Sequence, residues 1–181
     1  MSKKIVATTS LAGCFGCHMS ILDIDDKIID LVDVVEFNKS PLNDIKTFTK
    51  KADIGIIEGG CSNNENVHIL KEFRKNCEIL VSLGECAIMG GLPALRNTIS
   101  VGACLQEAYN GGPTTENDTG VLPNDKELPM LLDAVYPNHE VVKVDYFIPG
   151  CPPRADLIWR TLVALITGNQ ADIPYEVRKY D

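Results

Sequence analysis

"ADIGIIEGG", residues 52–60, is a short apolar run that two glycines end. A continuous apolar segment of this length, rich in isoleucine, is typical of a strand buried on both faces of a parallel sheet. Two similar runs lie on either side of it in the chain, "KKIVATTS" (3–10) and "CEILVSLG" (77–84). The three runs predict the central strands of one parallel sheet.

Predicted helices alternate with these strands. After the first strand, apolar residues recur at helical spacing, at Ile21, Ile24, Ile28 and Leu31. "ENVHILKEFRKN" (65–76) predicts a helix before the strand at 77–84, and "RADLIWRTLVALITG" (154–168) predicts the last helix, with Gly168 as its C-cap. Strands that alternate with helices predict parallel pairing through right-handed crossovers.

The remaining segments complete the expected architecture. "VDVVEFN" (32–38) and "EVVKVDYFIPG" (140–150) predict two more strands, residues 101–109 a short helix, and residues 111–129 a turn-rich surface excursion. We therefore expect an α/β, flavodoxin-like fold with a doubly wound, mostly parallel sheet. With no internal repeat or linker evident, one domain is expected over residues 1–181.

Charge and hydropathy exclude two classes of partner. Seventeen basic and twenty-five acidic side chains give a net charge of -8, which argues against a nucleic-acid binder, because such proteins need a basic face. No run approaches the roughly 20 apolar residues of a membrane-spanning helix. We expect neither nucleic acid nor a membrane as a partner.

The stretch "SLAGCFGCHMS" (10–20) has four interpretations. They are a haem c attachment motif, a lipoprotein cleavage box behind Lys3 and Lys4, a redox-active dithiol, and half of a metal or iron–sulfur site. The first two need export, and "IVATTS" is too short and too polar for the apolar core of a signal peptide. Seven cysteines without an export signal favour a reducing compartment, the cytoplasm.

Most cysteines follow predicted strands. These are Cys14 and Cys17 after the first strand, Cys61 after 52–60, Cys86 after 77–84, and Cys151 after 140–150. In an open α/β sheet the carboxyl ends of the strands form the ligand-binding edge, so these five cysteines are expected to converge there. Cys77 and Cys104 are expected to be small buried hydrophobic residues.

One close pair followed by single cysteines favours a 4Fe–4S cluster over structural zinc, which usually takes two close pairs. The contexts "SLGECA" and "IPGCPP" place glycine beside Cys86 and Cys151, which gives backbone room for a bulky cluster. Only one of Cys61 and Cys86 fits beside the other three ligands. Spacing alone leaves that choice open.

Four segments carry a resemblance to a known family, namely "GCFGCHMSILDID" (13–25), "IIEGG" (56–60), "SLGECAIMGGLPALRN" (82–97) and "IPGCPPRADLIW" (148–159). In this order they resemble the small, electron-transferring subunits of nickel–iron hydrogenases. The chain is most similar to the cytoplasmic, bidirectional, NAD(P)-coupled type, in which a histidine also follows the cysteine pair. The adjacent Cys-Cys pair of the related complex I subunit is not matched by "CFGC".

The resemblance implies a ligand set for one proximal 4Fe–4S cluster: Cys14, Cys17, Cys86 and Cys151, with Cys61 outside it. Glu58 matches the Glu-Gly of the family near the cluster, which implies a cluster neighbour or a catalytic proton relay; the alternative is a solvated carboxylate at a strand end. Since the chain ends at Asp181 without the extension that holds two further clusters in membrane-linked relatives, one cluster is expected.

The resemblance also implies a function. The chain would relay electrons between the Ni–Fe site of a large subunit and iron–sulfur and flavin (diaphorase) subunits that reduce NAD(P) or ferredoxin. It lacks the two Cys-x-x-Cys motifs that hold nickel and iron in the large subunit, so hydrogen activation is expected in that partner, against which the apolar strand-end loops would pack.

Two other functions stay open. One is a thiol oxidoreductase that uses Cys14 and Cys17. The other is a flavin-binding module, because this type of fold often holds FMN at the same edge, although no phosphate-binding loop is evident. His18 would either tune the cluster or make a structural hydrogen bond.

Overall fold

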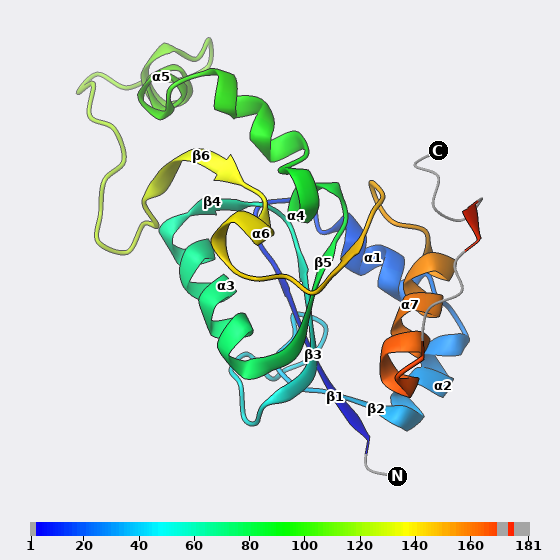
Figure 1. The fold of residues 1–181 in the computed structure, drawn as a ribbon. Coiled ribbons are helices and arrows are strands. Elements are labelled where there is room, and N and C mark those ends of the chain that lie inside the picture. Colours follow the sequence, from blue (N-terminus) through cyan, green and yellow to red (C-terminus); the bar gives the residue numbers. More distant parts are fainter. Residues whose placement is uncertain (1–2, 170–173, 176–181) are drawn as a thin grey trace.

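Five strands form one parallel sheet in the computed structural model, which describes residues 3–169 and 174–175 (Figure 1). The strands are β1 (Lys4–Ser10), β2 (Val35–Phe37), β3 (Ala52–Glu58), β5 (Cys77–Leu83) and β7 (Tyr146–Ile148). Every pairing in this sheet is parallel. The domain expected over residues 1–181 includes positions outside the described residues.

The strand order is β2-β1-β3-β5-β7. Counted along this sheet alone, that is the flavodoxin-like order 2-1-3-4-5, in which the chain reverses its direction of winding between β1 and β3. The predicted fold class is confirmed. The carboxyl ends of β1 and β3, where Ser10 pairs in register with Glu58, form the switch point of the sheet.

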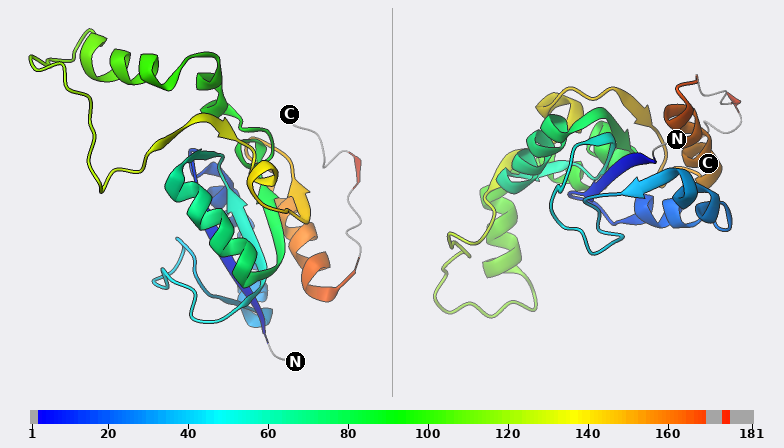
Figure 2. Two further views of the ribbon diagram at one scale, coloured as in Figure 1. Left: turned by 60° about the vertical axis from the view of Figure 1, so that its left-hand side comes forward. Right: turned by 90° about the horizontal axis from the view of Figure 1, so that it is seen from below.

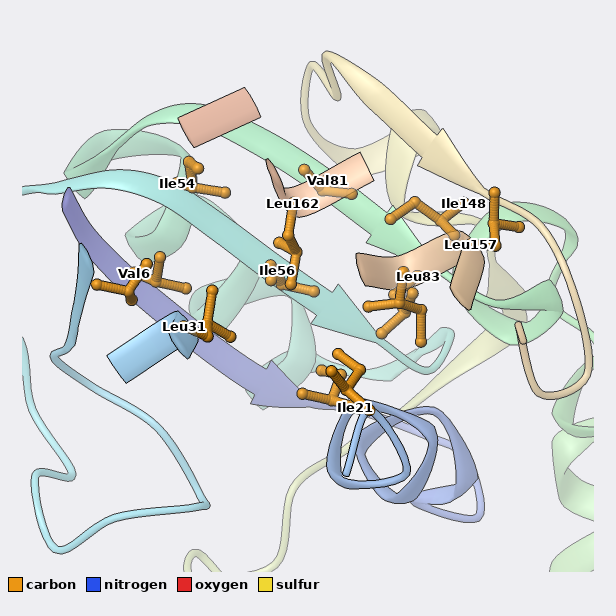
Figure 3. Close-up of a cluster of buried hydrophobic side chains, with 13 residues drawn as sticks. Val6, Ile21, Leu31, Ile54, Ile56, Val81, Leu83, Ile148, Leu157 and Leu162 are labelled. Atoms are coloured by element: carbon orange, nitrogen blue, oxygen red, sulfur yellow. The ribbon is translucent and has the colours of Figure 1, made fainter. Parts of the chain in front are cut away.

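Helices cover both faces of the sheet (Figures 1 and 2). One face packs against α1 (Gly16–Leu22), α2 (Lys27–Val34) and α7 (Ala155–Thr167). Figure 3 shows the buried side chains between them, among them Ile21, Leu31, Ile56, Leu83 and Leu162. The opposite face packs against α3 (Asn64–Asn76) through Leu70 and Phe73. As expected, α7 ends at Gly168, which has the left-handed conformation of a C-cap (φ 71°).

The helix expected through residues 21–31 is two helices. Asp25, between α1 and α2, has a φ of 62°, a left-handed conformation that aspartate tolerates better than most residues. The break still leaves Ile24 and Leu31 buried against the sheet. The strand expected at 32–38 is correspondingly shorter, because α2 continues to Val34.

The strand expected at 140–150 is wrong in its first half. Residues Asn138–Val141 form a short helix, α6, after Pro137. The pairing of β7 with β5 begins only at Tyr146. Before it, the Asp145 N–H donates to the Leu80 carbonyl (2.9 Å), but the Leu80 N–H donates to the Asp145 carboxylate (2.9 Å) instead of to a main-chain carbonyl.

Asp145 also binds Arg74 (2.5 Å), and replacing it with asparagine tests its contribution to stability. Burial alone raises the pKa of Asp145, but the hydrogen bonds from Arg74 and Leu80 outweigh it and hold that pKa below its usual value. Such a carboxylate stabilises the fold above its unfolded-state pKa of about 3.9, and loses this effect as the pH falls through the lower folded-state value. We expect Asp145→Asn to lower the free energy of unfolding by about 1–2 kcal/mol at neutral pH. Urea unfolding at a series of pH values measures this, and the difference in unfolding free energy between the variant and wild type should shrink below about pH 4. A difference that does not change with pH would contradict the stabilising role of the Asp145 carboxylate.

A long excursion leaves the sheet after β5. It comprises α4 (Glu85–Met89), the 3-10 helix η1 (Leu92–Thr98), α5 (Val101–Gln106) and the π-helical turn η2 (Glu107–Gly111). An extended segment then leads back to β6 (Leu131–Tyr136), as Figures 1 and 2 show. The expected short helix at 101–109 is thus present as α5 and η2, and residues 111–129 contain no strand and, beyond Gly111, no helix.

Two short strands were not expected. β4 (Cys61–Asn63) pairs antiparallel with β6. Arg96 holds this pair to η1 by donating to the carbonyls of Ser62 (3.2 Å) and Leu132 (3.0 Å). Over residues 3–169 and 174–175, no helix combines the length and the apolar character needed to cross a membrane.

Candidate metal centre at the sheet edge

The candidate site lies beyond the carboxyl ends of β1, β3, β5 and β7. The chain leaving β1 turns across the end of β3, where Ala12 and Gly60 exchange two backbone hydrogen bonds (3.0 and 2.8 Å). Gly59 makes this crossing possible: it has a φ of 84°, and a Cβ there would lie 2.7 Å from the backbone of Leu11. The loop with Cys14 and Cys17 is therefore fixed over the switch point.

The loops that carry Cys86 and Cys151 are joined to each other. Gly84 donates its N–H to the carbonyl of Ile148 (2.8 Å), and Glu85 donates to the carbonyl of Gly150 (3.0 Å). The Glu85 carboxylate in turn accepts the Gly150 N–H (3.2 Å). Cys86 lies in the first turn of α4 and Cys151 follows β7, so these bonds set the two cysteine loops side by side.

Three of the four sulfurs lie against glycine. A Cβ at Gly84 would lie 2.4 Å from the Cys17 sulfur, one at Gly91 2.8 Å from the Cys86 sulfur, and one at Gly16 3.1 Å from the Cys14 sulfur. Side chains at these glycines would occupy the space into which the sulfurs project. The glycines therefore form a cradle of bare backbone around the cysteines.

Gly84→Ala tests this cradle. Gly84 has a φ of 85°, and its new Cβ would overlap the Cys17 sulfur and approach the Gly150 carbonyl (3.4 Å). We expect a loss of stability of about 1–3 kcal/mol from the backbone strain, together with displacement of Cys17 and reduced iron uptake. The matched control is Gly102→Ala, since nothing lies within 4 Å of a Cβ at Gly102. Equal iron uptake by both variants would contradict the cradle.

The thiols also interact electrostatically. Burial, followed by Glu58, Cys86, Cys14 and Cys151 in that order of effect, raises the pKa of Cys17 to about 12. Burial likewise raises the pKa of Cys86; a main-chain hydrogen bond from Leu92 opposes this, whereas Cys151, Cys14 and Glu58 add to it. The structure thus brings the four predicted cysteines and Glu58 within electrostatic reach of one another.

Cys61 lies apart from this group, so the expectation that five cysteines converge at this edge is wrong for Cys61. It is fully buried (0% exposed) on β4, in the core between the sheet and α3. Burial alone raises its pKa, to about 11, without a contribution from any other cysteine. Of the two candidates for the fourth ligand, Cys86 interacts electrostatically with Cys14, Cys17 and Cys151, and Cys61 does not.

Of the other two cysteines, Cys77 is buried at the start of β5, as expected. The expectation for Cys104 is wrong: it is only half-buried, because α5 lies away from the sheet and buries none of its residues.

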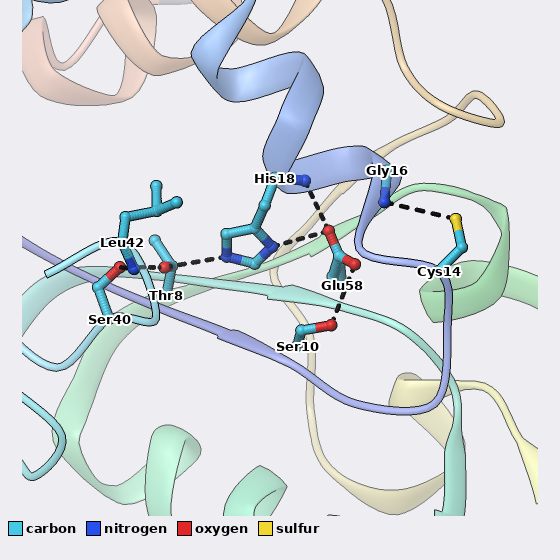
Figure 4. Close-up of polar contacts among 8 residues, drawn as sticks. All are labelled: Thr8, Ser10, Cys14, Gly16, His18, Ser40, Leu42 and Glu58. Carbon is cyan, nitrogen blue, oxygen red and sulfur yellow. Dashed lines mark hydrogen bonds and ion pairs between the residues drawn. The ribbon is translucent and has the colours of Figure 1, made fainter.

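Glu58 is not a solvated strand-end carboxylate, since it is only 2% exposed. One of its oxygens accepts the main-chain N–H of His18 (2.6 Å) and lies 2.7 Å from the His18 Nδ1 atom. The other accepts the hydroxyl of Ser10 (3.0 Å). The His18 Nε2 atom lies 3.0 Å from the Thr8 hydroxyl, as Figure 4 shows. Both ring nitrogens therefore have protein partners, unlike those of a haem-ligating histidine.

Thr8 and Ser10 were missed as members of this network. With Thr9 between them, they lie on the same side of β1 as Val6, the side that α1 covers. Two hydroxyls at a spacing of two within a buried strand are a signal for a polar partner across that face, and that partner is the His18–Glu58 pair.

A groove of about 490 Å³ lies at the opposite, amino-terminal edge of the sheet. Lys51, Asp53, Lys75 and Cys77 are among its lining residues. None of the four candidate ligands or Glu58 lines it, so it is separate from the candidate site.

Comparison with known proteins gives consistent matches. The family model described as "NADH ubiquinone oxidoreductase, 20 Kd subunit" matches residues 14–165. The chain is 45% identical to the NAD-reducing hydrogenase HoxS subunit delta of Cupriavidus necator over 97% of this chain and 85% of that protein. It is 41% identical to a subunit of the F420-non-reducing hydrogenase of Methanothermobacter thermautotrophicus over 96% of this chain, but spans only 57% of that relative.

A solved structure has the same fold as this protein over 99% of its length. A chain in the crystal structure of an NAD+-reducing NiFe-hydrogenase in the H2-reduced state superposes with a TM-score of 0.94, at 47% identity and 99% coverage of both chains. The chain therefore belongs to the family of the NADH ubiquinone oxidoreductase 20 Kd subunit, and within it to the nickel–iron hydrogenase small subunits.

Proposed function

We propose that this chain holds one 4Fe–4S cluster through Cys14, Cys17, Cys86 and Cys151, and relays electrons within a multisubunit hydrogenase. The observation that carries the proposal is the glycine cradle, in which Gly16, Gly84 and Gly91 leave room beside three of the sulfurs. Four thiols gathered at one edge supply the donor set of such a cluster.

The arrangement of the thiols supports a cluster over a single metal ion. Within the part of the chain that the structure describes, no three His, Cys, Asp or Glu side chains are grouped closely enough to hold one ion. Tetrahedral zinc needs all four sulfurs at about 2.3 Å from a single centre. A cubane cluster spreads its cysteines over four irons, and so accepts sulfurs that are farther apart.

The residues around the thiols have separate parts in this function. When bound, the cluster would accept and release one electron at a time. Hydrogen bonds to its ligands tune its potential, and the Gly16 N–H already points at the Cys14 sulfur (3.4 Å). Glu58, buried at the end of β3, is proposed as a cluster neighbour or proton relay, because among the ionisable side chains it has the largest effect on the Cys17 thiol.

The proposed main partner is the large subunit that holds the Ni–Fe site. Met89, Leu92, Leu95 and Ile99, which follow Cys86 along the chain, are 48–69% exposed. An exposed apolar group of this kind beside a site is typical of a subunit interface. Since the Cupriavidus relative is named as part of an NAD-reducing hydrogenase, diaphorase subunits are proposed as the further partners and NAD(P) or ferredoxin as the acceptor, with a cytoplasmic location.

The apolar group gives a test of this interface. Leu92 and Leu95 are 69% and 68% exposed, so Leu92→Ser/Leu95→Ser should leave the fold of the chain intact and reduce self-association of the isolated protein. The same double variant should lose large subunit in co-purification. Exposed Ile29 on α2 (66%) provides the control, Ile29→Ser, which should retain it. Equal recovery of the large subunit with both variants would contradict the interface.

Iron and acid-labile sulfide analysis of the anaerobically purified chain tests the cluster itself. About four irons and four sulfides per chain are expected. Zinc, covalent haem or no metal would each contradict the proposal.

The two alternatives find less support. A thiol oxidoreductase would use only Cys14 and Cys17, and gives no role to Cys86 and Cys151, which lie within electrostatic reach of that pair at the same sheet edge. A flavin-binding module would hold FMN at the switch point, where the side chains of His18 and Glu58 are buried against each other (Figure 4).

A further inference from the structure

Phe15, between the two cysteines of the loop, has a backbone conformation that phenylalanine rarely adopts. Its φ of 67° and ψ of 8° lie in the left-handed region, where the Cβ crowds the backbone. A residue in this region needs surrounding contacts that hold it there. The Phe15 ring has such a contact, because it stacks on the His18 imidazole with 4.6 Å between ring centroids and 5° between ring planes.

The His18 ring is in turn held in place by contacts to the central strands of the sheet. It is fully buried, and its two nitrogens contact Glu58 on β3 (2.7 Å) and Thr8 on β1 (3.0 Å). The Thr8 hydroxyl also lies 2.7 Å from the Ser40 hydroxyl, which extends the buried chain of hydrogen bonds (Figure 4). Any rotation or shift of the ring would break bonds to both central strands.

We infer that His18 is a positioning residue for the cysteine pair. Its ring is anchored to β1 and β3 on its edges and carries Phe15 on its face, and Phe15 is flanked by Gly16 and Cys14. The stack thereby sets the path of the backbone from Cys14 to Cys17 and the placement of the two sulfurs. The inference rests on the proposed function, because the sulfurs it positions are proposed cluster ligands.

The experiment uses the full chain reconstituted anaerobically with iron and sulfide. Phe15→Leu removes the aromatic face, His18→Gln keeps hydrogen-bonding groups but removes the ring, and Phe15→Tyr keeps the stack. Phe73→Leu is the control for general destabilisation, because Phe73 is fully buried on the opposite face of the sheet. The readouts are the rate at which a chelator removes iron and the electron paramagnetic resonance spectrum of the reduced protein.

We expect iron release to accelerate about 10–100-fold in Phe15→Leu and His18→Gln, as when a residue that orients a metal ligand is lost, with an altered spectrum. The double variant should be no worse than either single variant, since both remove one contact. Phe15→Tyr and Phe73→Leu should behave as wild type. Wild-type rates of iron release and wild-type spectra in Phe15→Leu and His18→Gln would overturn this inference but not the proposed function. An equal effect of Phe73→Leu would do the same. A wild-type chain that takes up no iron and sulfide would overturn the proposed function and the inference with it.

Discussion

Replacing Cys86 with serine or alanine is expected to abolish the stable binding of iron by the chain, whereas Cys61→Ser retains about four irons. Cys86 interacts electrostatically with Cys14 and Cys151 and lies against Gly91 at the sheet edge. Cys61 is enclosed in the core on the other side of β3 from α1. Three thiolates leave one iron of a cubane without a protein ligand, so the loss should be close to complete.

Iron should be measured per folded chain, because Cys61→Ser places a hydroxyl in an apolar core. That burial costs about 1–3 kcal/mol unless the hydroxyl finds a partner, and lowers the yield of folded protein without removing a ligand. Cys77→Ser is a second control of the same kind, since Cys77 is also buried in that core. Retention of iron in Cys86→Ala together with its loss in Cys61→Ser would reverse the ligand assignment.

Replacing Glu58 with alanine is expected to destabilise the chain by about 3–5 kcal/mol, even without metal. The change leaves the main-chain N–H of His18, its ring nitrogen and the Ser10 hydroxyl without their shared partner. His18 is fully buried, so water does not readily replace the carboxylate at its N–H and its ring nitrogen, and their desolvation is not compensated. Urea unfolding of the metal-free chain measures the loss.

Glu58→Gln is the matched variant, because it keeps the shape of the side chain and two polar atoms for the same three groups. Its cost should be smaller, about 1–2 kcal/mol. Asp53, half-buried at the opposite end of β3, provides a comparison for a strand-end carboxylate that water reaches. A loss below about 1 kcal/mol in Glu58→Ala would show that the buried network does not stabilise the fold.

The central sheet was predictable because strands that are buried on both faces have continuous apolar sequences, as at 52–58. β4 was not predictable, because three residues, "CSN", carry no periodic signal and pair with a distant strand. Val141, Val142 and Val144 misled the prediction at 140–150: they pack against the core beneath α3, but from α6 and irregular backbone. Apolar character indicated burial there and did not distinguish between backbone conformations.

For the candidate site, topology explains what sequence could predict. Cysteines that follow parallel strands are expected at one edge, so the gathering of Cys14, Cys17, Cys86 and Cys151 followed from the strand order. The same argument wrongly included Cys61, which lies on β4 in the core. The burial of Glu58 did not follow, because a carboxylate before two glycines also fits an exposed turn. It depends on His18 lying above β1 and β3, a tertiary contact between residues 40 positions apart.

The two outer strands of the sheet, β2 and β7, have three residues each, whereas the three inner strands have seven. An unpaired strand edge is a template on which other chains can add strands and aggregate, and very short edge strands offer few unpaired N–H and C=O groups for this. The sheet is therefore protected against edge-to-edge polymerisation at both sides. A subunit built in this way can expose apolar loops for assembly with other chains while its own strands remain closed to them.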